Sequence, residues 1–469
     1  MTVRLHELTA TETLAAYTST ELSPVEVTEA ILERLEAREP QINGFYVVEA
    51  ERARSLASES EKRWLAGEPR GTIDGIAVTL KENMATEGTP LPSGTAAWAD
   101  ALPAIADGPV ATLVSQGGGV RIGKTVMPDF GMLSSGVSSL HGVTRSPWNP
   151  SWTVGGSSGG AAAAAAAGIG PLHLGSDIGG SVRLPASWLG LVSLKPTYGL
   201  IPVDTPYMGR AYGPMTRTTD DAALLMSATA RPDARDFTQV DAGLNWMSIV
   251  GTEVADSRIA PLRIAVQLDA GWGAPVDPEV EKAILAAAAL FADTGATVEH
   301  IGPLVDSSLL DSLDLFLRAR SLLDITRMAP ERRAKVLPFI LDWVDGATGA
   351  GGLDLIAAYQ DIQALKGRTV AATMAYDLVL SPVSPGAAFP AEWPMPSNDA
   401  ATSLHHIGFT APYNFSDQPA ASINAGFTED GRPIGLQLAG RRFDDLGVLA
   451  ATRWFEFARP QSAAPRWPS

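Results

Sequence analysis

The chain has 469 residues, of which 45% are apolar and 19% are charged, so it is long enough for one large core or two domains. Its formal net charge is −17 at pH 7. Such an acidic surface argues against nucleic acid or an anionic membrane as the main partner, because phosphate binding needs clustered Lys and Arg. There is no cysteine, which excludes disulfides, thiolate catalysis and zinc–thiolate sites.

We expect no membrane signal at the N-terminus or in the most apolar run of the chain. The N-terminus has no basic region followed by an apolar stretch, so no signal peptide is expected. The most apolar run, Ala161 to Leu174, is interrupted by Gly168, Gly170 and Pro171 and is too short to span a bilayer. We therefore predict a soluble, cytoplasmic protein.

Helix starts mark the beginning of the chain. Ser23-Pro24-Val25-Glu26 combines a serine cap, a proline at the first helical position and a glutamate three residues after the cap. Thr9-Ala10-Thr11-Glu12 is a similar start. We expect residues 1–60 to form a helical packing segment.

The stretch from Gly75 to Leu80 predicts a short buried strand, and Lys81 follows it directly. A lysine there is either a side chain that reaches solvent or a functional group, because burying its ammonium is costly.

Two glycine turns that contain serine flank a run of alanines. The first is Gly155-Gly156-Ser157-Ser158-Gly159-Gly160, and the second runs from Gly175 through Ser181 to Arg183. Residues 161–167 between them are all alanine and predict one helix with small side chains. Glycine turns leave backbone N–H groups uncovered, so they suit a site where amides must touch a substrate.

A phosphate-binding loop is a formal match elsewhere in the chain. Gly118, Gly123, Lys124 and Thr125 have the required spacing. That loop needs a strand before it and a helix after it, whereas residues 111–115 look helical and Pro128 follows closely. We interpret this motif as a chance match.

The serine turns also fit the nucleophile elbow of the α/β hydrolases. That fold needs an acid and then a histidine downstream of the serine. His300 lies in a strand-like context, and His405-His406 lies in a loop. An esterase of the α/β-hydrolase type is therefore a rival enzyme class.

Taken together, Lys81 and the two serine turns resemble the amidase signature family. The separation of 24 residues between Ser157 and Ser181 also matches the family's two serines. The match covers most of the chain and implies one domain over residues 1–469. The expected fold class is α/β, with a single large α/β/α domain around a mixed, many-stranded central sheet and no metal or organic cofactor. Further matching segments are residues 184–186, 193–199, 213–217, 380–385 and 424–441.

The resemblance assigns the chemistry of the site. The serine that matches Ser181 is the nucleophile, the one that matches Ser157 relays a proton, and the lysine that matches Lys81 is the base. A cis peptide bond before Ser157 is implied as well. For Lys81 to accept a proton near pH 7, its pKa must fall from ~10.4 by roughly three units, and burial is the expected cause.

Other residues of the two turns take supporting roles by the same resemblance. The backbone amides expected to face the substrate carbonyl oxygen are those of Ile178, Gly179, Gly180 and Ser181. The residues expected to shape the site are Asp177, Arg183, Gly156 and Ser158, although an ordinary ion pair between Asp177 and Arg183 is an equal alternative. Departures from the family pattern are Glu82, Val154 and Ser176, and they affect fine positioning rather than the reaction.

The second half of the chain is less distinctive. Residues 306–363 are helix-rich with a glycine-rich interruption at 346–352, and such a segment could cap the active site. We expect its large aromatic residues Phe316, Phe339 and Trp343 to be core rather than substrate contacts. Our candidates for the substrate pocket are Gly131, Met132, Tyr207 and Trp393, from their positions in loops.

These observations predict a serine hydrolase that cleaves C–N bonds through an acyl-enzyme intermediate. The expected partner is a small-molecule amide or carbamate, and carboxamides, aryl anilides and carbamates all remain open as substrates. One alternative is the glutamine-hydrolysing A-type subunit of a transfer-RNA amidotransferase, which shares these motifs. Another is a catalytically idle scaffold, disfavoured because Lys81, Ser157 and Ser181 are all present. The sequence does not decide whether the protein is a homodimer.

Overall fold

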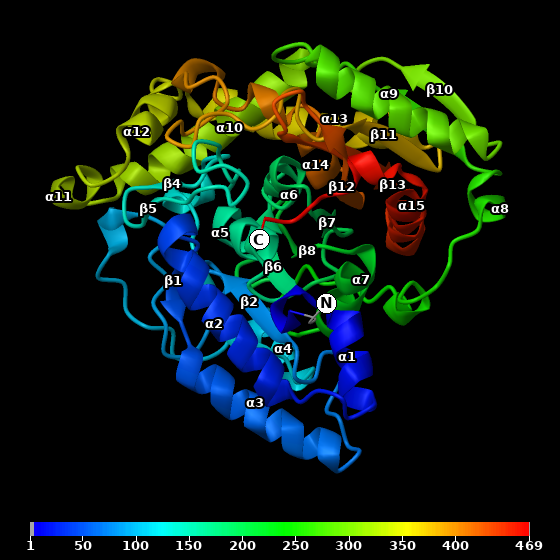
Figure 1. Ribbon diagram of the computed structural model, residues 1–469. Coiled ribbons are helices and arrows are strands. Elements are labelled where there is room, and N and C mark those ends of the chain that lie inside the picture. The colour runs from blue at the N-terminus through cyan, green and yellow to red at the C-terminus, as the bar shows by residue number, and fades with distance from the viewer. Residues whose placement is uncertain (1–3, 469) are drawn as a thin grey trace.

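The computed structural model describes residues 4–468 and is built on one large mixed sheet (Figure 1). Its eleven strands have the order β1-β3-β2-β6-β8-β7-β12-β13-β11-β9-β10, and β4 pairs with β5 in a separate hairpin. The strands are β1 (Phe45–Val48), β2 (Ala77–Lys81), β3 (Val120–Thr125), β4 (Val137–Ser138), β5 (Gly142–Val143), β6 (Leu172–Asp177), β7 (Val192–Lys195), β8 (Ala211–Thr216), β9 (Arg263–Gln267), β10 (Thr297–Ile301), β11 (Leu378–Pro382), β12 (Ala420–Phe427) and β13 (Pro433–Gly440).

The sheet contains two parallel groups of three strands, an antiparallel middle and an antiparallel edge strand, β1. Strands β3, β2 and β6 run parallel, as do β11, β9 and β10, whereas the strands from β6 to β11 alternate in direction. Every residue of β2, β3, β6, β7, β8, β11 and β13 is buried. Strands buried throughout need a cover on both faces of the sheet. The predicted α/β/α architecture around a mixed sheet is therefore confirmed.

Helices enclose this sheet, with α2 and α3 beside the strands of the first third of the chain and α9 beside those of the last third (Figure 1). They are α1 (Ala10–Thr18), α2 (Pro24–Ile42), α3 (Ala50–Leu65), α4 (Pro109–Gln116), α5 (Gly159–Ala167), α6 (Arg183–Leu189), α7 (Thr219–Thr229), α8 (Asp256–Ile259), α9 (Pro278–Asp293), α10 (Ser307–Thr326), α11 (Pro330–Arg333), α12 (Pro338–Asp345), α13 (Gly352–Thr373), α14 (Ala411–Phe415) and α15 (Asp445–Ala458). Short 3-10 turns are η1 (Leu5–Glu7), η2 (Ala96–Trp98), η3 (Asp129–Gly131), η4 (Trp246–Ser248), η5 (Ala400–Thr402), η6 (His405–Ile407) and η7 (Gln461–Ala463).

The first two predicted helix starts form as expected, but the N-terminal segment is not helical throughout. The Ser23 side chain accepts from the Glu26 amide at 3.2 Å, and Glu26 accepts from the Ser23 amide at 2.8 Å. Thr9 and Glu12 form the same reciprocal cap on α1. Phe45–Val48, however, is strand β1, which pairs antiparallel with β3 at the edge of the sheet. Aromatic and β-branched residues favour such a strand, and here that preference wins over the surrounding helices.

The formal phosphate-loop motif lies inside a strand. Gly123, Lys124 and Thr125 are the last three residues of β3, and all are buried. The Lys124 ammonium donates to the backbone carbonyls of Glu82 and Met84. A loop with amides open to a phosphate is therefore not formed, and the interpretation as a chance match is confirmed.

The strand order brings the two serine turns together. Strands β2 and β6 are parallel neighbours, so Lys81 at the end of β2 and Asp177 at the end of β6 lie at the same edge of the sheet. Helix α5 connects the first turn to β6, and all of its nine residues are buried. Its side chains are no larger than methyl groups, which lets the helix pack closely against β2, β3, β6 and β8.

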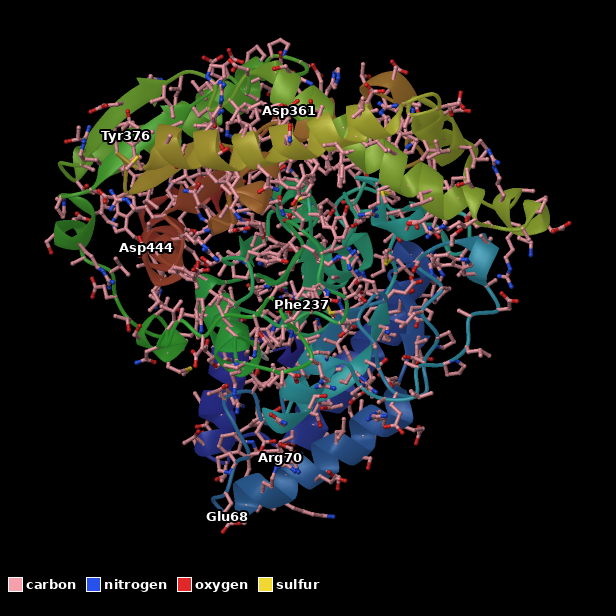
Figure 2. All side chains as sticks on the ribbon, turned by 180° about the vertical axis from the view of Figure 1, so that it is seen from behind. Glu68, Arg70, Phe237, Asp361, Tyr376 and Asp444 are labelled. Carbon is pink, nitrogen blue, oxygen red and sulfur yellow. The ribbon has the colours of Figure 1, made fainter. Side chains whose placement is uncertain are left out.

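Residues 307–373 form four consecutive helices, α10 to α13, which we call the helical wall. Its apolar residues, among them Leu310, Leu313 and Ile340, belong to a hydrophobic cluster that also contains Leu184 of α6. The outer surface of the molecule carries charged side chains such as the exposed Glu68 and Asp444 (Figure 2). Within residues 4–468, no helix combines the length and apolar character needed to cross a bilayer.

Candidate active site

Lys81 is fully buried and surrounded by serine hydroxyls. Its ammonium nitrogen Nζ lies 2.8 Å from Oγ of Ser157, 3.0 Å from Oγ of Ser158 and 2.9 Å from Oγ of Ser176. Ser176 also accepts from Nδ2 of Asn83 at 3.1 Å. Burial is the main cause that lowers the pKa of Lys81 to about 7, and the positive charge of Arg210 lowers it further. The lysine can therefore lose its proton near neutral pH, as its position after a buried strand suggested.

The first serine turn is shaped by close backbone packing. The peptide bond between Gly156 and Ser157 is cis, as the family resemblance implies. A Cβ on Gly156 would lie 2.5 Å from the carbonyl oxygens of Leu133 and Ser135, so only glycine fits there. The amide of Ser158 donates to the Ser181 carbonyl at 3.2 Å, which ties the two serine turns to each other.

The second serine turn presents three of the four predicted amides. The amides of Ile178, Gly179 and Ser181 make no hydrogen bond to any residue in the range 4–468. The Gly180 amide instead donates to Oδ1 of Asp177 at 2.8 Å. Our expectation that Gly180 faces the substrate is therefore wrong for this structure. The Asp177 carboxylate competes for that N–H, and a sequence pattern does not reveal such a side-chain acceptor.

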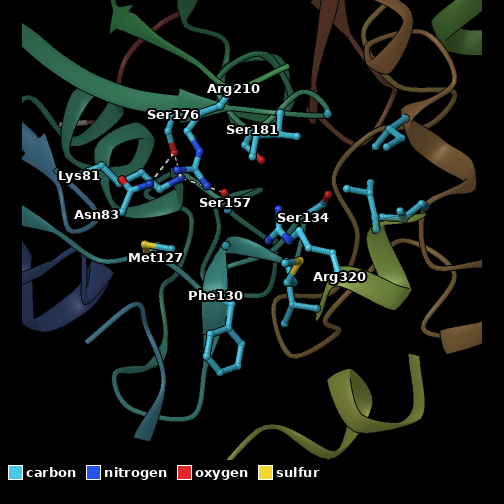
Figure 3. Close-up of a pocket in the computed structure, with 18 of the residues that line it drawn as sticks. Lys81, Asn83, Met127, Phe130, Ser134, Ser157, Ser176, Ser181, Arg210 and Arg320 are labelled. Atoms are coloured by element: carbon cyan, nitrogen blue, oxygen red, sulfur yellow. Dashed lines mark hydrogen bonds between the residues drawn. The ribbon is translucent and has the colours of Figure 1, made fainter. Parts of the chain in front are cut away.

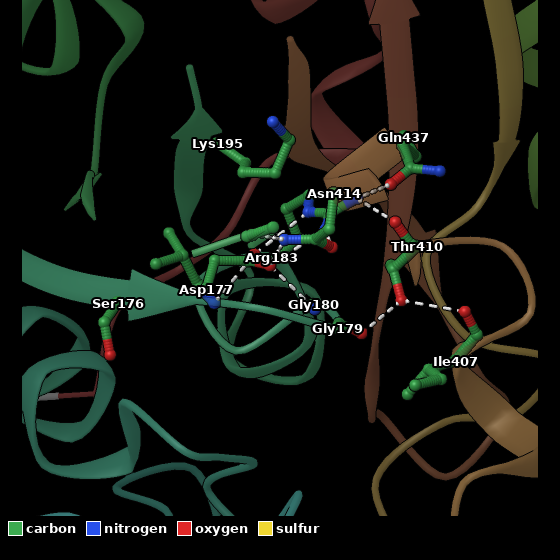
Figure 4. A network of polar contacts seen from close by, with 12 residues as sticks. Ser176, Asp177, Gly179, Gly180, Arg183, Lys195, Ile407, Thr410, Asn414 and Gln437 are labelled. Atoms are coloured by element: carbon green, nitrogen blue, oxygen red, sulfur yellow. Dashed lines mark hydrogen bonds and ion pairs between the residues drawn. The ribbon is translucent and has the colours of Figure 1, made fainter. Parts of the chain in front are cut away.

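The Asp177 carboxylate and the Arg183 guanidinium form a fully buried, two-pronged ion pair (Figure 4). Nε of Arg183 lies 3.0 Å from Oδ2 of Asp177, and Nη2 lies 2.9 Å from Oδ1. Burial by itself would raise the pKa of Asp177, but the charge and hydrogen bonds of Arg183 outweigh it and hold that pKa below its ordinary value. The carboxylate thus stays ionised and holds the second serine turn in shape.

The remaining hydrogen bonds of Arg183 reach into the last quarter of the chain (Figure 4). Nη1 donates to the Thr410 carbonyl at 3.0 Å and to Oε1 of Gln437 at 2.8 Å, and Nη2 donates to Oδ1 of Asn414 at 2.6 Å. Asn414 in turn donates to Asp177 at 2.8 Å. The ion pair is therefore part of a satisfied buried network rather than an isolated surface pair.

A pocket opens over these turns (Figure 3). Gly131 lines it next to Ser157 with φ +69°, and a Cβ there would come within 3.3 Å of Oγ of Ser157. The helical wall contributes Leu317, Arg320 and Trp343 to the lining. The full lining consists of Lys81, Asn83, Met127, Phe130, Gly131, Met132, Leu133, Ser134, Ser157, Ser176, Ile178, Gly179, Ser181, Arg210, Leu317, Arg320, Trp343, Leu404 and Ile407.

Among the four residues predicted to bind substrate, the structure places Gly131 and Met132 in the lining. Tyr207 and Trp393 do not line this pocket. The Tyr207 ring instead contacts the guanidinium groups of Arg210 and Arg320, which do. Trp393 is 39% exposed elsewhere on the surface.

Sequence reasoning missed several polar residues of the pocket. Asn83 lies only two residues after Lys81, and Arg210 follows the Tyr207-Met208 pair already considered, so their positions offered a local hint. Arg320 lies in the middle of α10 and has no motif around it. Of the three aromatic residues expected in the core, Trp343 is a buried member of the hydrophobic cluster that also lines the pocket, and Phe316 and Phe339 are partly buried and pack against that cluster.

The histidines lie outside the two serine turns, although His406 reaches Ser134 in the lining of the pocket. His300 lies on β10 near the far edge of the sheet, and His406 is paired with Oγ of Ser134 at 2.8 Å. Within the described part of the chain, no histidine hydrogen-bonds to Ser157, Ser158 or Ser181. The arrangement required of an α/β-hydrolase triad is therefore not present among residues 4–468.

Comparison with known proteins agrees with this geometry. The sequence profile described as Amidase matches residues 26–449. An acylamidase of Rhodococcus erythropolis is 35% identical over 97% of this chain and 96% of its own length. The A-type subunit of the glutamyl-tRNA(Gln) amidotransferase of Synechococcus sp. (strain CC9605) is 32% identical over 95% of this chain and 96% of its own. The chain therefore belongs to the amidase signature family.

A solved structure extends the agreement to the fold. The crystal structure of a bacterial aryl acylamidase from the same family superposes with a TM-score of 0.88 at 28% identity. The alignment covers 98% of both chains. The eleven-stranded sheet and the elements that surround it are thus shared over nearly the whole length.

Proposed function

We propose that the protein hydrolyses the C–N bond of linear amides and carbamates, with Ser181 as nucleophile, Ser157 as proton relay and Lys81 as base. The observation that carries the proposal is the buried Lys81, whose pKa is lowered to about 7 and whose Nζ lies 2.8 Å from Oγ of Ser157. Ser157 and Ser181 line the same pocket, which needs no histidine to supply a base. Similarity to the acylamidase of Rhodococcus erythropolis supports an acyl amide as the substrate class.

The hydrogen bonds around Lys81 favour Ser157 as the relay over its neighbours. A neutral lysine amine has two N–H groups and one lone pair, so one of its three serine partners must donate to it. The Ser158 hydroxyl donates to the Ser176 carbonyl at 3.2 Å, so it must accept from Lys81. Oγ of Ser176 accepts from Asn83 with a lone pair and keeps its own proton, so Ser157 and Ser176 can both donate to Nζ. Of these two hydroxyls, Ser157 has no other hydrogen-bond partner among residues 4–468, and we assign the relay to it.

The reaction then follows in two halves. Oγ of Ser181 attacks the carbonyl carbon, its proton passes to Ser157, and the Ser157 proton passes to neutral Lys81. The amides of Ile178, Gly179 and Ser181 stabilise the developing oxyanion. The proton returns through Ser157 to the leaving nitrogen as the C–N bond breaks. Water then attacks the acyl-enzyme by the same proton route and releases the acid; for a carbamate, this acid loses the carbon dioxide.

The proposal is tested by comparing wild type with Ser181→Ala on an acyl anilide, a primary amide, an aryl carbamate and a simple ester. We expect wild type to cleave the anilide or the carbamate and to be labelled covalently by a fluorophosphonate at Ser181. Ser181→Ala should lose both properties, whereas the control Ser115→Ala, at an exposed serine of α4, should keep both. Full turnover by Ser181→Ala, or labelling at another serine, would refute the assignment.

The glutamine-hydrolysing component of an amidotransferase is the second candidate. It is favoured by the similarity to the Synechococcus protein over nearly the whole of both chains. Ammonia release from glutamine, together with co-purification of partner proteins from the native organism, would support it. Cleavage of anilides by the isolated chain, without glutaminase activity, would exclude it.

A further inference from the structure

Two arginines of the pocket make no salt bridge within residues 4–468, although the Asp204 carboxylate is near enough to raise the pKa of Arg210. Arg210 precedes β8 and Arg320 lies on α10, and both side chains point into the pocket beside Ser157 and Ser181 (Figure 3). Arg210 donates to the Thr205 carbonyl at 2.9 Å, and Arg320 makes no hydrogen bond within residues 4–468. Neither forms an ion pair with any of these residues.

The absence of salt bridges is unusual because the two guanidinium groups lie close to each other. Both pack on the ring of Tyr207, with the Arg210 carbon 5.6 Å and the Arg320 carbon 4.8 Å from its centroid. Two like charges are thus held on one ring. Burial lowers the pKa of Arg210, and the charge of Arg320 lowers it further. By contrast Arg318, two residues away on α10, lies 2.8 Å from the Asp314 carboxylate.

We propose that Arg210 and Arg320 bind a carboxylate of the substrate, which is an amide with an anionic group separated from the scissile bond by an apolar spacer. The inference rests on the proposed function. Guanidinium groups match the planar geometry of a carboxylate and bind it with two parallel hydrogen bonds. Apolar lining residues such as Met127, Met132 and Leu317 suit the spacer. In a chain of net charge −17, a cationic pocket also raises the local concentration of an anionic substrate.

Two matched pairs of substrates test the proposal and locate the carboxylate. The first pair places it on the acyl side: the monoanilide of glutaric acid, and the anilide in which an isopropyl group replaces the carboxylate. The second pair places it on the amine side: para-acetamidobenzoate and para-isopropylacetanilide. We expect wild type to prefer the anionic member of at least one pair by about tenfold or more in kcat/KM, because a hydrogen-bonded charge is worth that much.

Variants of the two arginines then test whether the preference for the anionic substrate arises from Arg210 and Arg320. In Arg320→Gln the ratio between anionic and neutral substrate should fall about tenfold. The ratio is measured within one variant, so a general loss of activity cancels. Arg327→Gln, which removes an exposed charge at the end of the same helix, should keep the wild-type ratio. If Arg320→Gln does not fold, Arg210→Gln provides the same comparison.

Binding to Ser181→Ala, measured by calorimetry with the same four compounds, separates this inference from the proposed function. Tighter binding of the anionic member that is lost in the Ser181→Ala, Arg320→Gln double variant supports the subsite, even if wild type hydrolyses none of the compounds. Equal hydrolysis and equal binding within both pairs would overturn the inference while leaving the hydrolase assignment intact. A preference that survives in Arg320→Gln and Arg210→Gln would overturn it as well.

Discussion

The two sides of the pocket are built in different ways. One side, which we call the serine floor, consists of Lys81 and the two turns at residues 155–160 and 175–183. It rests on the central sheet and on α5, whose residues are all buried. The opposite side is the helical wall, α10 to α13, whose outward residues include the exposed Leu353 and Ile356, while Leu317 and Trp343 face the pocket and are buried. We expect the floor to set the reaction and the wall, which holds no member of the proposed triad, to set the choice of substrate.

Hydrogen bonding distinguishes the two sides as clearly as burial does. On the floor, the charged groups of Asp177 and Arg183 are satisfied by partners with no exposure to water. On the wall, Arg320 has no partner charge among the described residues. A satisfied network resists change, whereas an open cation is available to a ligand. Substitutions on the floor should therefore affect every substrate alike, and substitutions on the wall should affect substrates selectively.

The largest expected effect comes from removing Lys81, the proposed general base on the serine floor. Lys81→Met should lower kcat/KM by about 10²- to 10⁴-fold, because proton transfer from Ser157 loses its acceptor. All cleaved substrates should be affected to a similar degree. The measurement is steady-state kinetics on an anilide and a carbamate, with the exposed Lys62→Met as control. Retention of full amide turnover by a folded Lys81→Met would show that the proton takes another route.

The next effect concerns stability. Arg183→Met should destabilise the protein by about 3–5 kcal/mol, because it leaves the Asp177 carboxylate buried without its charge partner. Chemical unfolding measures this directly, with Arg52→Met at an exposed position as control. Adding Asp177→Asn should recover part of the loss, since it removes the unpaired charge. If the double variant were less stable than Arg183→Met alone, the charge would not be the cause.

A change of pH should have a smaller effect on kcat/KM. Only neutral Lys81 can accept a proton, and its pKa is lowered to about 7, so kcat/KM should rise with pH and level off above it. Between pH 6 and pH 8 the rise should be about tenfold. Rate measurements in buffers of constant ionic strength test this, with folding checked by circular dichroism at each pH. A flat profile across this range would mean that Lys81 is already neutral or is not the base.

The smallest effect should come from the apolar part of the wall. Leu317→Ala enlarges the pocket opposite the floor, so we expect KM to change by about 3- to 10-fold for bulky anilides. The effect on kcat should be smaller. Leu323→Ala on the same helix is the matched control, because Leu323 is 48% exposed and does not line this pocket. Equal effects of the two variants on KM would argue against a role of the wall in substrate choice.

The sequence predicted the serine floor more completely than the rest of the pocket. The strand before Lys81, the alanine helix and both serine turns lie in short continuous motifs, and these were predicted together with the fold. Arg320 meets Arg210 only at the ring of Tyr207, more than 100 residues earlier in the chain, and no local pattern marks Arg320. The Gly180 amide was misassigned because its acceptor is a side chain three residues earlier. The four-residue strand β1 was too short to stand out between two helices.

The hydrogen bonds of Arg183 to residues far along the chain have a consequence for biosynthesis. Three of its partners, Thr410, Asn414 and Gln437, lie more than 220 residues further along the chain. A ribosome makes the chain from the N-terminus, so both serine turns emerge long before the groups that complete their support. Until β13 has been synthesised, Arg183 lacks the amide oxygen of Gln437. We therefore expect nascent chains and C-terminally truncated fragments to hold the serine floor in an unfinished, aggregation-prone form, so that activity appears only when translation is nearly complete.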